Sequence, residues 1–131
     1  MFGIKKIQKN KRKVMLIVED DALLCRALTE AFSHEMFDVQ GVGNGLDVAD
    51  AVKKKMPDVI LLDLILPGLD GFAVLKQLKS ETKTASIPVV VISNLGSAAD
   101  VKSAKSLGAE EYFIKANSEI KQIIDYVKNL F

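Results

Sequence analysis

Five short apolar runs recur along the chain at regular intervals. They cover residues 14–18, 37–42, 59–62, 87–92 and 112–114. The first, third and fourth runs are rich in valine and isoleucine and are nearly continuous, a pattern typical of strands buried on both faces of a parallel sheet. The pattern therefore predicts five strands.

The stretches between these runs have helical spacing. In the first stretch, apolar residues return every three or four positions between Ala22 and Phe32, and Asp21 precedes them as a candidate N-cap. Strand and helix alternate five times, which predicts an α/β fold with a parallel sheet, right-handed crossovers and helices on both faces. The further helices are expected from Asn44 to the lysines at 53–55, over residues 72–79, from Ser97 to Gly108, and over residues 118–130.

Polar or charged residues directly follow four of the five predicted strands. In open α/β sheets, ligands bind beyond the carboxyl ends of the strands, so these positions are candidates for a functional site. One exposed acid at a strand end is more often a helix cap or a solvated side chain, but the joint occurrence favours a site. The residues are Glu19, Asp20 and Asp21 after the first strand, Asp63 after the third, Ser93 and Asn94 after the fourth, and Lys115 after the fifth.

The carboxylates in this set favour a divalent metal ion. Acids that lie close together repel one another and raise each other's pKa values, and a hard cation such as Mg²⁺ relieves the repulsion by taking carboxylate and water oxygens as ligands. A dinucleotide-binding fold would place a glycine-rich loop after the first strand, where this chain has Glu19, Asp20 and Asp21. We therefore expect Mg²⁺, for which Mn²⁺ or Ca²⁺ can substitute, and no nucleotide cofactor.

Asp63 has the chemistry of a nucleophile toward phosphorus. A carboxylate can attack a phosphoryl group and form an aspartyl phosphate, and such a step is catalysed mainly by positioning and electrostatic stabilisation. A metal ion would neutralise one side of the transferred group, while Lys115 would supply a second positive charge and the Ser93 hydroxyl a hydrogen bond. These groups together would make a complete phosphoryl-accepting site.

Four segments resemble the receiver domain of two-component response regulators, and the resemblance spans about residues 13–130. They are VMLIVEDD at 14–21, VILLDLILPGLDG at 59–71, VVVISN at 89–94 and GAEEYFIK at 108–115. The resemblance implies a doubly wound (βα)5, flavodoxin-like fold for residues 13–131, with strand order 2-1-3-4-5. It also implies a phosphoryl donor, which is a histidine kinase or a histidine phosphotransfer protein, and a separate downstream effector protein that reads the signal.

The resemblance assigns four residues of this chain to the metal site. Asp63 matches the phosphoacceptor, which is also a metal ligand. Glu19 and Asp20 match the acidic pair that holds Mg²⁺, with Asp20 as the more direct ligand and Glu19 acting through water. Ile65 matches the position whose backbone carbonyl completes the metal shell.

Three further residues match the phosphate-binding and switching positions of the family. Lys115 matches the lysine that pairs with the phosphoryl group, and Ser93 matches the switch hydroxyl that turns toward the phosphate. Tyr112 matches the switch aromatic residue, whose rotation is coupled to that turn. In the family, the output is a change in the face formed by the fourth helix, the fifth strand and the fifth helix.

The sequence departs from the family pattern at three places. Glu19 replaces the commoner aspartate. Ile65 and Asn94 stand where polar or small residues often tune hydrolysis, and an apolar Ile65 predicts a long-lived phosphate. Ala116 stands where the family usually has a proline in a cis peptide. Because a cis bond before a non-proline residue costs about 3–4 kcal/mol, the Lys115–Ala116 peptide is expected to be trans in an altered loop, or cis and strained.

Three other functions fit parts of the pattern. A pseudo-receiver, which keeps the fold but signals without phosphorylation, is favoured only by Ala116. A phosphatase with an aspartyl nucleophile needs a second acid two residues later as general acid, and that position is Ile65. A flavin-binding electron carrier of similar topology is disfavoured, because the chain has neither a phosphate-binding loop nor any tryptophan to stack on a flavin ring.

Charge is distributed unevenly over the 131 residues, which give room for one domain. Residues 1–13 contain six of the 18 basic residues and no acid, so residues 14–131 carry 12 basic and 17 acidic residues, a net charge of −5. The acidic body gives no reason to expect nucleic-acid binding. Residues 1–12 are expected to form a basic arm, either a solvated tail or a contact to an acidic partner, a membrane surface or nucleic acid.

Hydropathy and cysteine content indicate the compartment. No apolar run reaches the roughly 18 residues that a membrane span needs, and no apolar stretch of the signal-peptide kind follows the charged N-terminus. The single cysteine, Cys25, can form no internal disulfide, which fits a reducing environment. We therefore expect a cytoplasmic protein without a membrane span.

Overall fold

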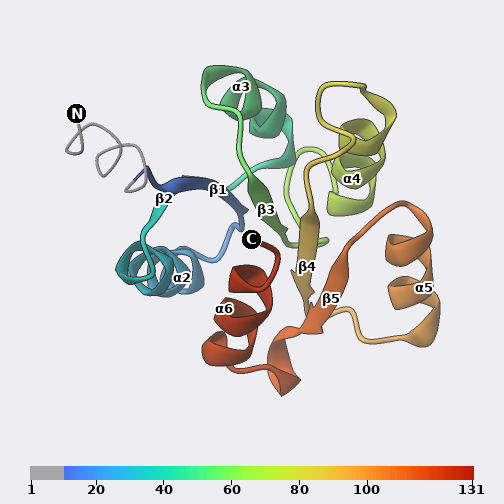
Figure 1. The fold of residues 1–131 in the computed structure, drawn as a ribbon. Helices are drawn as coiled ribbons and strands as arrows, with labels where there is room; N and C mark the ends of the chain where they lie inside the picture. Colours follow the sequence, from blue (N-terminus) through green and yellow to red (C-terminus); the bar gives the residue numbers. More distant parts are fainter. Residues whose placement is uncertain (1–10) are drawn as a thin grey trace, which may run out of the picture.

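A five-stranded parallel sheet forms the centre of the computed structural model, which describes residues 11–131 (Figure 1). The strand order is β2-β1-β3-β4-β5, which confirms the predicted topology. The strand that was expected from residue 87 begins at Val89, because Pro88 has no N–H to donate to the sheet. The strands are β1 (Lys13–Val18), β2 (Phe37–Val42), β3 (Val59–Leu62), β4 (Val89–Ser93) and β5 (Glu111–Ile114).

Among residues 11–131, five α-helices connect and follow the strands, and side chains at two of the expected helix starts cap them. The Asp21 carboxylate accepts a hydrogen bond from the N–H of Leu23 at 3.0 Å, and the Ser97 hydroxyl accepts one from the N–H of Asp100 at 3.1 Å. The helices are α2 (Ala22–His34), α3 (Val48–Lys54), α4 (Gly71–Ser80), α5 (Ala98–Ser106) and α6 (Ile120–Lys128), with 3₁₀ turns η1 (Gly45–Asp47) and η2 (Lys115–Asn117).

Two helix starts differ from the prediction. The Asn44 side chain accepts a hydrogen bond from the N–H of Leu46 at 2.8 Å, but it opens the 3₁₀ turn η1, and α3 begins only at Val48. The last helix begins at Ile120 and not at residue 118, because η2 and two extended residues intervene after β5. A 3₁₀ turn occupies residues assigned to the second helix, whereas residues 118 and 119, which were assigned to the last helix, are extended.

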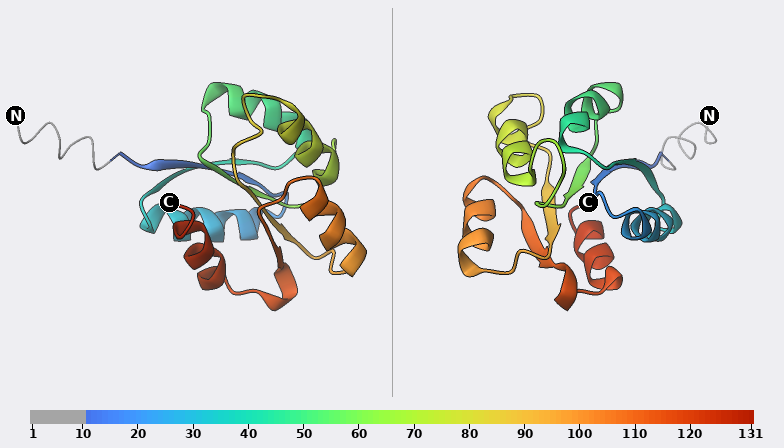
Figure 2. Two further views of the ribbon diagram at one scale, coloured as in Figure 1. Left: turned by 45° about the vertical axis from the view of Figure 1, so that its right-hand side comes forward. Right: turned by 180° about the vertical axis from the view of Figure 1, so that it is seen from behind.

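The sheet lies between two helical layers, each with its own apolar core (Figure 2). Helices α3, α4 and α5 cover one face, and α2 and α6 cover the other (Figures 1 and 2). Side chains of β1 alternate between the two cores, with Leu16 and Val18 on the first face and Met15 and Ile17 on the second. Burial on both faces explains why β1, β3 and β4 are nearly continuous apolar runs.

The segment between β3 and α4 folds back tightly onto the end of β3. The N–H of Gly71 donates to the carbonyl of Leu64 at 2.9 Å. A Cβ atom at position 71 would lie 2.4 Å from the carbonyl oxygen of Asp63, closer than real Cβ contacts come. Glycine is therefore required where α4 begins, and this close approach fixes the backbone that carries Asp63.

Only the last part of the expected basic arm falls within the described residues, since residues 1–10 lie outside them. Lys11 and Arg12 are exposed, and the Arg12 guanidinium donates to the carbonyl of Phe37 at 3.4 Å. Among residues 11–131, no helix has the length and apolar character needed to span a membrane.

Candidate functional site

Glu19 and Asp63 leave the sheet side by side because the strands that carry them are hydrogen-bonded neighbours. Val18 of β1 is paired with Leu62 of β3, and these are the last residues of the two strands. The N–H of Asp63 donates to the carbonyl of Val18 at 2.9 Å, and the N–H of Glu19 donates to the carbonyl of Val42 at 3.0 Å. Both acids are thus held by the hydrogen-bonding pattern of the sheet and not by a mobile loop.

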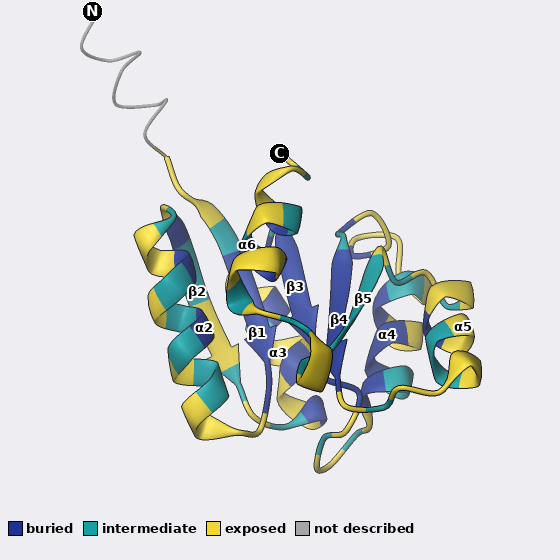
Figure 3. Cartoon of the chain, turned by 90° about the horizontal axis from the view of Figure 1, so that it is seen from below, coloured by how far each residue is buried: buried dark blue, intermediate teal, exposed yellow. Residues whose placement is uncertain are grey.

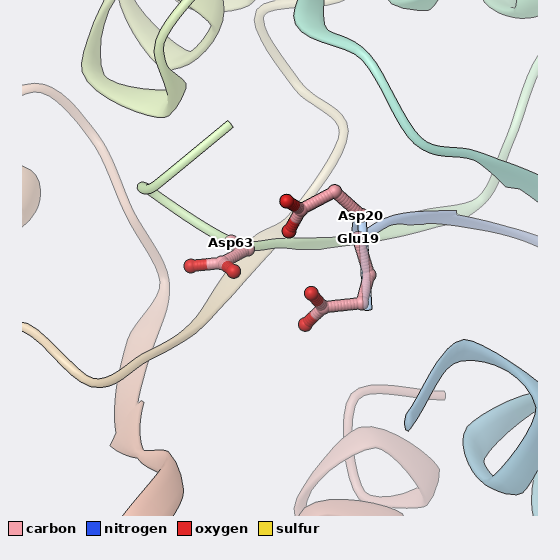
Figure 4. Close-up of side chains that lie close together, drawn as sticks. All are labelled: Glu19, Asp20 and Asp63. Atoms are coloured by element: carbon pink, nitrogen blue, oxygen red, sulfur yellow. The ribbon is translucent and has the colours of Figure 1, made fainter. Parts of the chain in front are cut away.

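The carboxylates of Glu19, Asp20 and Asp63 converge beyond this edge of the sheet (Figure 4). One oxygen from each lies within 4.8 Å of the others. Glu19 and Asp63 are buried, whereas Asp20 is exposed. Three carboxylate oxygens at such separations fit the ligand preference of a hard divalent cation such as Mg²⁺.

Lys115 bridges the two buried acids from the end of β5, two strands away from β3. Its Nζ lies 2.7 Å from Oε1 of Glu19 and 2.8 Å from Oδ2 of Asp63. The lysine directly follows β5, and β5 is separated from β3 by β4, so its side chain reaches across the end of β4. Lys115 was expected near Asp63, but its second contact, with Glu19, was not predicted from the sequence.

Main-chain groups hold the remaining oxygens of the two buried acids. The N–H of Asp21 donates to Oε2 of Glu19 at 3.0 Å, and the N–H of Ile65 donates to Oδ1 of Asp63 at 3.1 Å. In each buried carboxylate, therefore, one oxygen accepts a hydrogen bond from a backbone N–H and the other pairs with the Lys115 ammonium. This arrangement fixes the orientation of both carboxylates before any ligand enters.

The pKa values of the site reflect burial and opposite charge. Burial raises the pKa of Glu19, and hydrogen bonds from Lys115 and from the Asp21 backbone offset only part of the rise. Burial alone would lower the pKa of Lys115, but the hydrogen bonds to Asp63 and Glu19 outweigh it, so the pKa of the ammonium lies above its ordinary value. Lys115 is therefore firmly cationic within a strongly acidic cluster.

Ser93 and Tyr112 both contact the backbone of Leu95. Ser93 is fully buried, and its Oγ accepts a hydrogen bond from the N–H of Leu95 at 3.2 Å. The Tyr112 hydroxyl donates to the carbonyl of Leu95 at 2.5 Å. Burial raises the pKa of the Tyr112 phenol, and the neighbouring Ser93 side chain counteracts part of this effect. The two residues are thus linked through the segment after β4, while the Ser93 hydroxyl binds Leu95 and not Asp63.

Two positions at which the chain departs from the family pattern lie close to the cluster. The Lys115–Ala116 peptide is trans, one of the two alternatives that the sequence left open, and the chain turns at once into η2. Ile65 is 52% exposed beside Asp63, although its N–H donates a hydrogen bond to that carboxylate. The predicted role of the Ile65 carbonyl as a metal ligand stays a prediction.

Comparisons with known proteins agree with the geometry. Residues 15–128 match the model of the response regulator receiver domain family. The chain is 35% identical over 114 residues to sporulation initiation phosphotransferase F of Bacillus subtilis, covering 87% of this chain and 90% of that protein. It is also 35% identical over 104 residues to the DNA-binding response regulator MtrA of Mycobacterium tuberculosis, covering 79% of this chain. The matched part spans only 44% of MtrA, less than half its length.

Solved structures show the same architecture. The signal receiver domain of a DNA-binding response regulator from Colwellia psychrerythraea superposes with a TM-score of 0.84 at 29% identity, covering 90% of this chain and 97% of that one. The Mn²⁺-bound form of response regulator Rcp1 superposes with a TM-score of 0.75 at 28% identity, covering 90% of this chain and 91% of that one. The second structure is of a relative with a divalent metal ion.

Proposed function

Because the chain belongs to the response regulator receiver domain family, we propose that Asp63 accepts a phosphoryl group from a phosphohistidine. The donor is a histidine kinase or a histidine phosphotransfer protein. The observation that carries this proposal is the buried carboxylate of Asp63, oriented by the N–H of Ile65 and paired with Lys115. The roles of the metal ligands, Lys115 and Ser93 in this proposal follow from their positions around the Asp63 carboxylate.

In the transfer, a carboxylate oxygen of Asp63 attacks phosphorus while the bond from phosphorus to the donor histidine nitrogen breaks. The other ring nitrogen of the phosphohistidine carries a proton, so the histidine leaves as the neutral imidazole. Glu19, Asp20, Asp63 and the carbonyl of Ile65 would hold Mg²⁺, which supplies positive charge to the oxygens of the transferred group. The reaction needs no further acid or base from this chain, so positioning and charge are its main contributions.

Lys115 then changes partners. Once phosphorylated, Asp63 no longer presents two charged oxygens, and the ammonium pairs with the new phosphoryl oxygens. The buried Ser93 hydroxyl turns from Leu95 toward the phosphate and offers a hydrogen bond. Because Tyr112 contacts the same Leu95 backbone, the two movements are coupled and bias a two-state equilibrium of the α5, β5 and α6 face. A separate effector protein reads that face.

The protein acts in this scheme as a switch and not as an enzyme for other substrates. It catalyses only its own phosphorylation and a slow dephosphorylation, and the exposed Ile65 beside Asp63 favours a long-lived phosphate by limiting the approach of water. We place it in the cytoplasm, and we treat residues 1–12 as an arm distinct from the receiver domain at 13–131.

The test is the intact mass of the protein after incubation with acetyl phosphate, with and without Mg²⁺. We expect a metal-dependent gain of one phosphoryl group that Asp63→Asn abolishes. The matched control is Asp50→Asn, which changes an exposed acid in the first turn of α3 and should leave labelling intact. Full labelling of Asp63→Asn would refute the assignment of Asp63.

A pseudo-receiver remains the alternative, and the same experiment separates the two. A folded wild-type protein that gains no mass with acetyl phosphate and Mg²⁺ would favour it. The observation behind this alternative is Ala116, which stands where the family usually has proline. Against it, Lys115 still reaches Asp63 from the trans peptide at 2.8 Å.

A further inference from the structure

β2 forms one edge of the sheet, and β1 is its only neighbouring strand among residues 11–131. Figure 3 shows β2 at the margin of the sheet, exposed over part of its length. A strand at such an edge carries a row of N–H and C=O groups with which a further strand can pair. The six residues Phe37–Val42 therefore offer a binding surface that the phosphoacceptor site does not use.

Two residues of β2, Val39 and Gly41, direct their main-chain groups to the free edge. In a parallel sheet, alternate residues of a strand turn both N–H and C=O toward the same neighbouring strand. The carbonyl of Val42 accepts a hydrogen bond from the N–H of Glu19 at the end of β1, so Val42 and Gln40 face β1. Val39 and Gly41 alternate with these residues and therefore face away from β1. Gly41 is exposed and Val39 is half-buried.

Two open hollows flank the free edge of β2, one on each face of the sheet. Cys25 and Thr29 of α2 line the first hollow together with Gly41. Asp50 and Lys54 of α3 line the second hollow, again together with Gly41. Cys25 and Thr29 have small side chains and Gly41 has none, so α2 does not hide the strand at this point. A second strand can therefore approach β2 in the plane of the sheet.

The charges along this edge have opposite signs at its two ends. Arg12 lies at the start of β2, where its guanidinium donates to the carbonyl of the first residue of the strand. Lys54 ends α3 near the same place, because the neighbouring Lys55 pairs with Asp38. Asp50, in the first turn of α3, lines the hollow beside the end of β2. The edge therefore runs from a basic start to an acidic end.

We propose that a second copy of this chain binds to β2, with the two strands antiparallel and related by a two-fold axis. With Val39 on that axis, its N–H and C=O exchange hydrogen bonds with those of the partner's Val39. Gly41 then pairs with the partner's Phe37. Asp38 lies opposite the partner's Gln40, so no like charges face each other within the strand pair.

The two-fold arrangement also makes the charges of the edge complementary to themselves. Because antiparallel pairing reverses one copy, the basic start of each edge meets the acidic end of the other. Lys54 of each copy then faces the partner's Asp50 across the joined hollows. An isologous contact needs a surface that is complementary to itself, and this edge meets that requirement. The charge pattern therefore favours a second copy of the chain as the occupant.

Such a dimer leaves both phosphoacceptor sites accessible. Asp63 follows the last residue of β3, and antiparallel pairing points the carboxyl ends of the two sheets in opposite directions. β5, which belongs to the proposed output face, forms the other edge of the sheet and stays uncovered as well. Pairing through β2 is therefore compatible with the proposed switch and does not depend on it.

The test is amide hydrogen exchange of the complete chain, followed by NMR over a series of protein concentrations and paired with sedimentation equilibrium. We expect sedimentation to show a monomer–dimer equilibrium. As the dimer fills, the N–H groups of Val39 and Gly41 should exchange several-fold more slowly, because each becomes hydrogen-bonded to the partner. The N–H of Gln40, which faces β1, is the internal control and should already be protected at the lowest concentration.

Charge reversal tests the two-fold arrangement. Lys54→Glu should weaken dimerisation about tenfold at low salt, because each dimer contains the contact twice. Asp50→Lys should weaken it similarly, and the double variant Lys54→Glu/Asp50→Lys should regain most of the wild-type affinity. Lys121→Glu, which changes an exposed lysine on α6, is the matched control and should dimerise like the wild type.

Three outcomes would overturn the proposal. The first is a protein that stays monomeric at every concentration. The second is a dimer whose formation leaves exchange at Val39 and Gly41 unchanged, which would place the contact elsewhere on the molecule. The third is a double variant that dimerises no more tightly than the single variants, which would exclude this two-fold arrangement. Asp63→Asn should dimerise like the wild type, so failure of dimerisation would leave the phosphoacceptor assignment of Asp63 untouched.

Discussion

Lys115 and Glu19 form a buried ion pair, with Nζ 2.7 Å from Oε1, although they follow strands at different parts of the sheet. The side chain of Glu19 is 3% exposed and that of Lys115 is 18% exposed. The same ammonium also holds Asp63. Any cation that enters the acidic cluster therefore competes with Lys115 for two of the carboxylates. A phosphoryl group on Asp63 would likewise change which oxygens the Lys115 ammonium contacts.

Lys115→Met should make the fold less stable at neutral pH. The substitution removes the cation between two buried carboxylates, and leaving buried charges uncompensated costs about 3 kcal/mol of unfolding free energy. Mg²⁺ should restore more stability to this variant than to the wild type, because a bound ion stabilises the folded state and no longer competes with the lysine. Urea unfolding with and without Mg²⁺ measures both effects.

Lys121→Met provides the control for this experiment, since Lys121 is exposed on α6. Its unfolding free energy should stay within about 0.5 kcal/mol of the wild type. A Lys115→Met protein as stable as this control, with an equal response to Mg²⁺, would show that the ion pair contributes nothing to stability.

Gly71→Ala should destabilise the protein and weaken phosphorylation together. The added Cβ would lie 2.4 Å from the Asp63 carbonyl and from the Cα of Leu64, so the backbone that carries the phosphoacceptor must shift. Overpacking of this kind costs about 1–3 kcal/mol. Denaturant unfolding and mass labelling by acetyl phosphate measure the two consequences.

Gly96→Ala is the matched control for Gly71→Ala. Gly96 is exposed, and a Cβ there would meet its nearest atom, on Ile114, at an ordinary 3.6 Å. We expect nearly unchanged stability and labelling. If the two alanine variants behaved alike, the close approach at Gly71 would not be what fixes the position of Asp63.

The sheet could be predicted because the sequence patterns that indicate its strands are local. A nearly continuous apolar run identifies each buried strand, and the polar residue that ends it identifies the candidate site, so Asp63 and Glu19 could be placed at one edge from sequence alone. The alternation of strands and helices then limits the topology to few choices. These inferences required no knowledge of side-chain contacts.

Contacts between distant segments could not be predicted in the same way. The pairing of Lys115 with Glu19 depends on how far one side chain reaches across the end of β4. The start of α3 depends on Gly45, which is buried and whose N–H binds the carbonyl of Pro67 at 3.2 Å in the loop after β3. Such contacts stabilise the 3₁₀ turn η1 over the α-helix that the local spacing favours.

Tyr112→Phe should lower the unfolding free energy by about 1 kcal/mol, the usual net contribution of one hydrogen bond. The lost bond joins the phenol to the Leu95 carbonyl at 2.5 Å, next to the buried Ser93. Tyr126→Phe is the control, because its hydroxyl donates to the Glu110 carbonyl at a longer 3.4 Å at an exposed site. Equal losses in the two variants would contradict a specific contribution of Tyr112 to the segment after β4.

Glu111 should make the stability of the fold depend on pH in the acid range. The N–H of Tyr112 lowers the pKa of its carboxyl, burial opposes this effect, and Lys105 lowers the pKa further. Since the folded-state pKa lies below the unfolded value of 4.5, the unfolded chain binds the proton more readily, and stability rises with pH across this interval. The stabilising contribution of the Glu111 carboxylate is complete above its pKa in the unfolded chain, and it is lost as the pH falls through its pKa in the folded protein.

The Glu111→Gln variant tests this dependence by comparison with the wild type. At neutral pH the variant should unfold at a lower urea concentration than the wild type, and the difference should shrink below pH 4.5 and disappear in stronger acid. Glu19→Gln should show the opposite trend, because burial raises the pKa of Glu19 and wild-type stability relative to that variant increases as the pH falls. A difference for Glu111→Gln that is constant from neutral to acid pH would show that the residue contributes through packing and not through its charge.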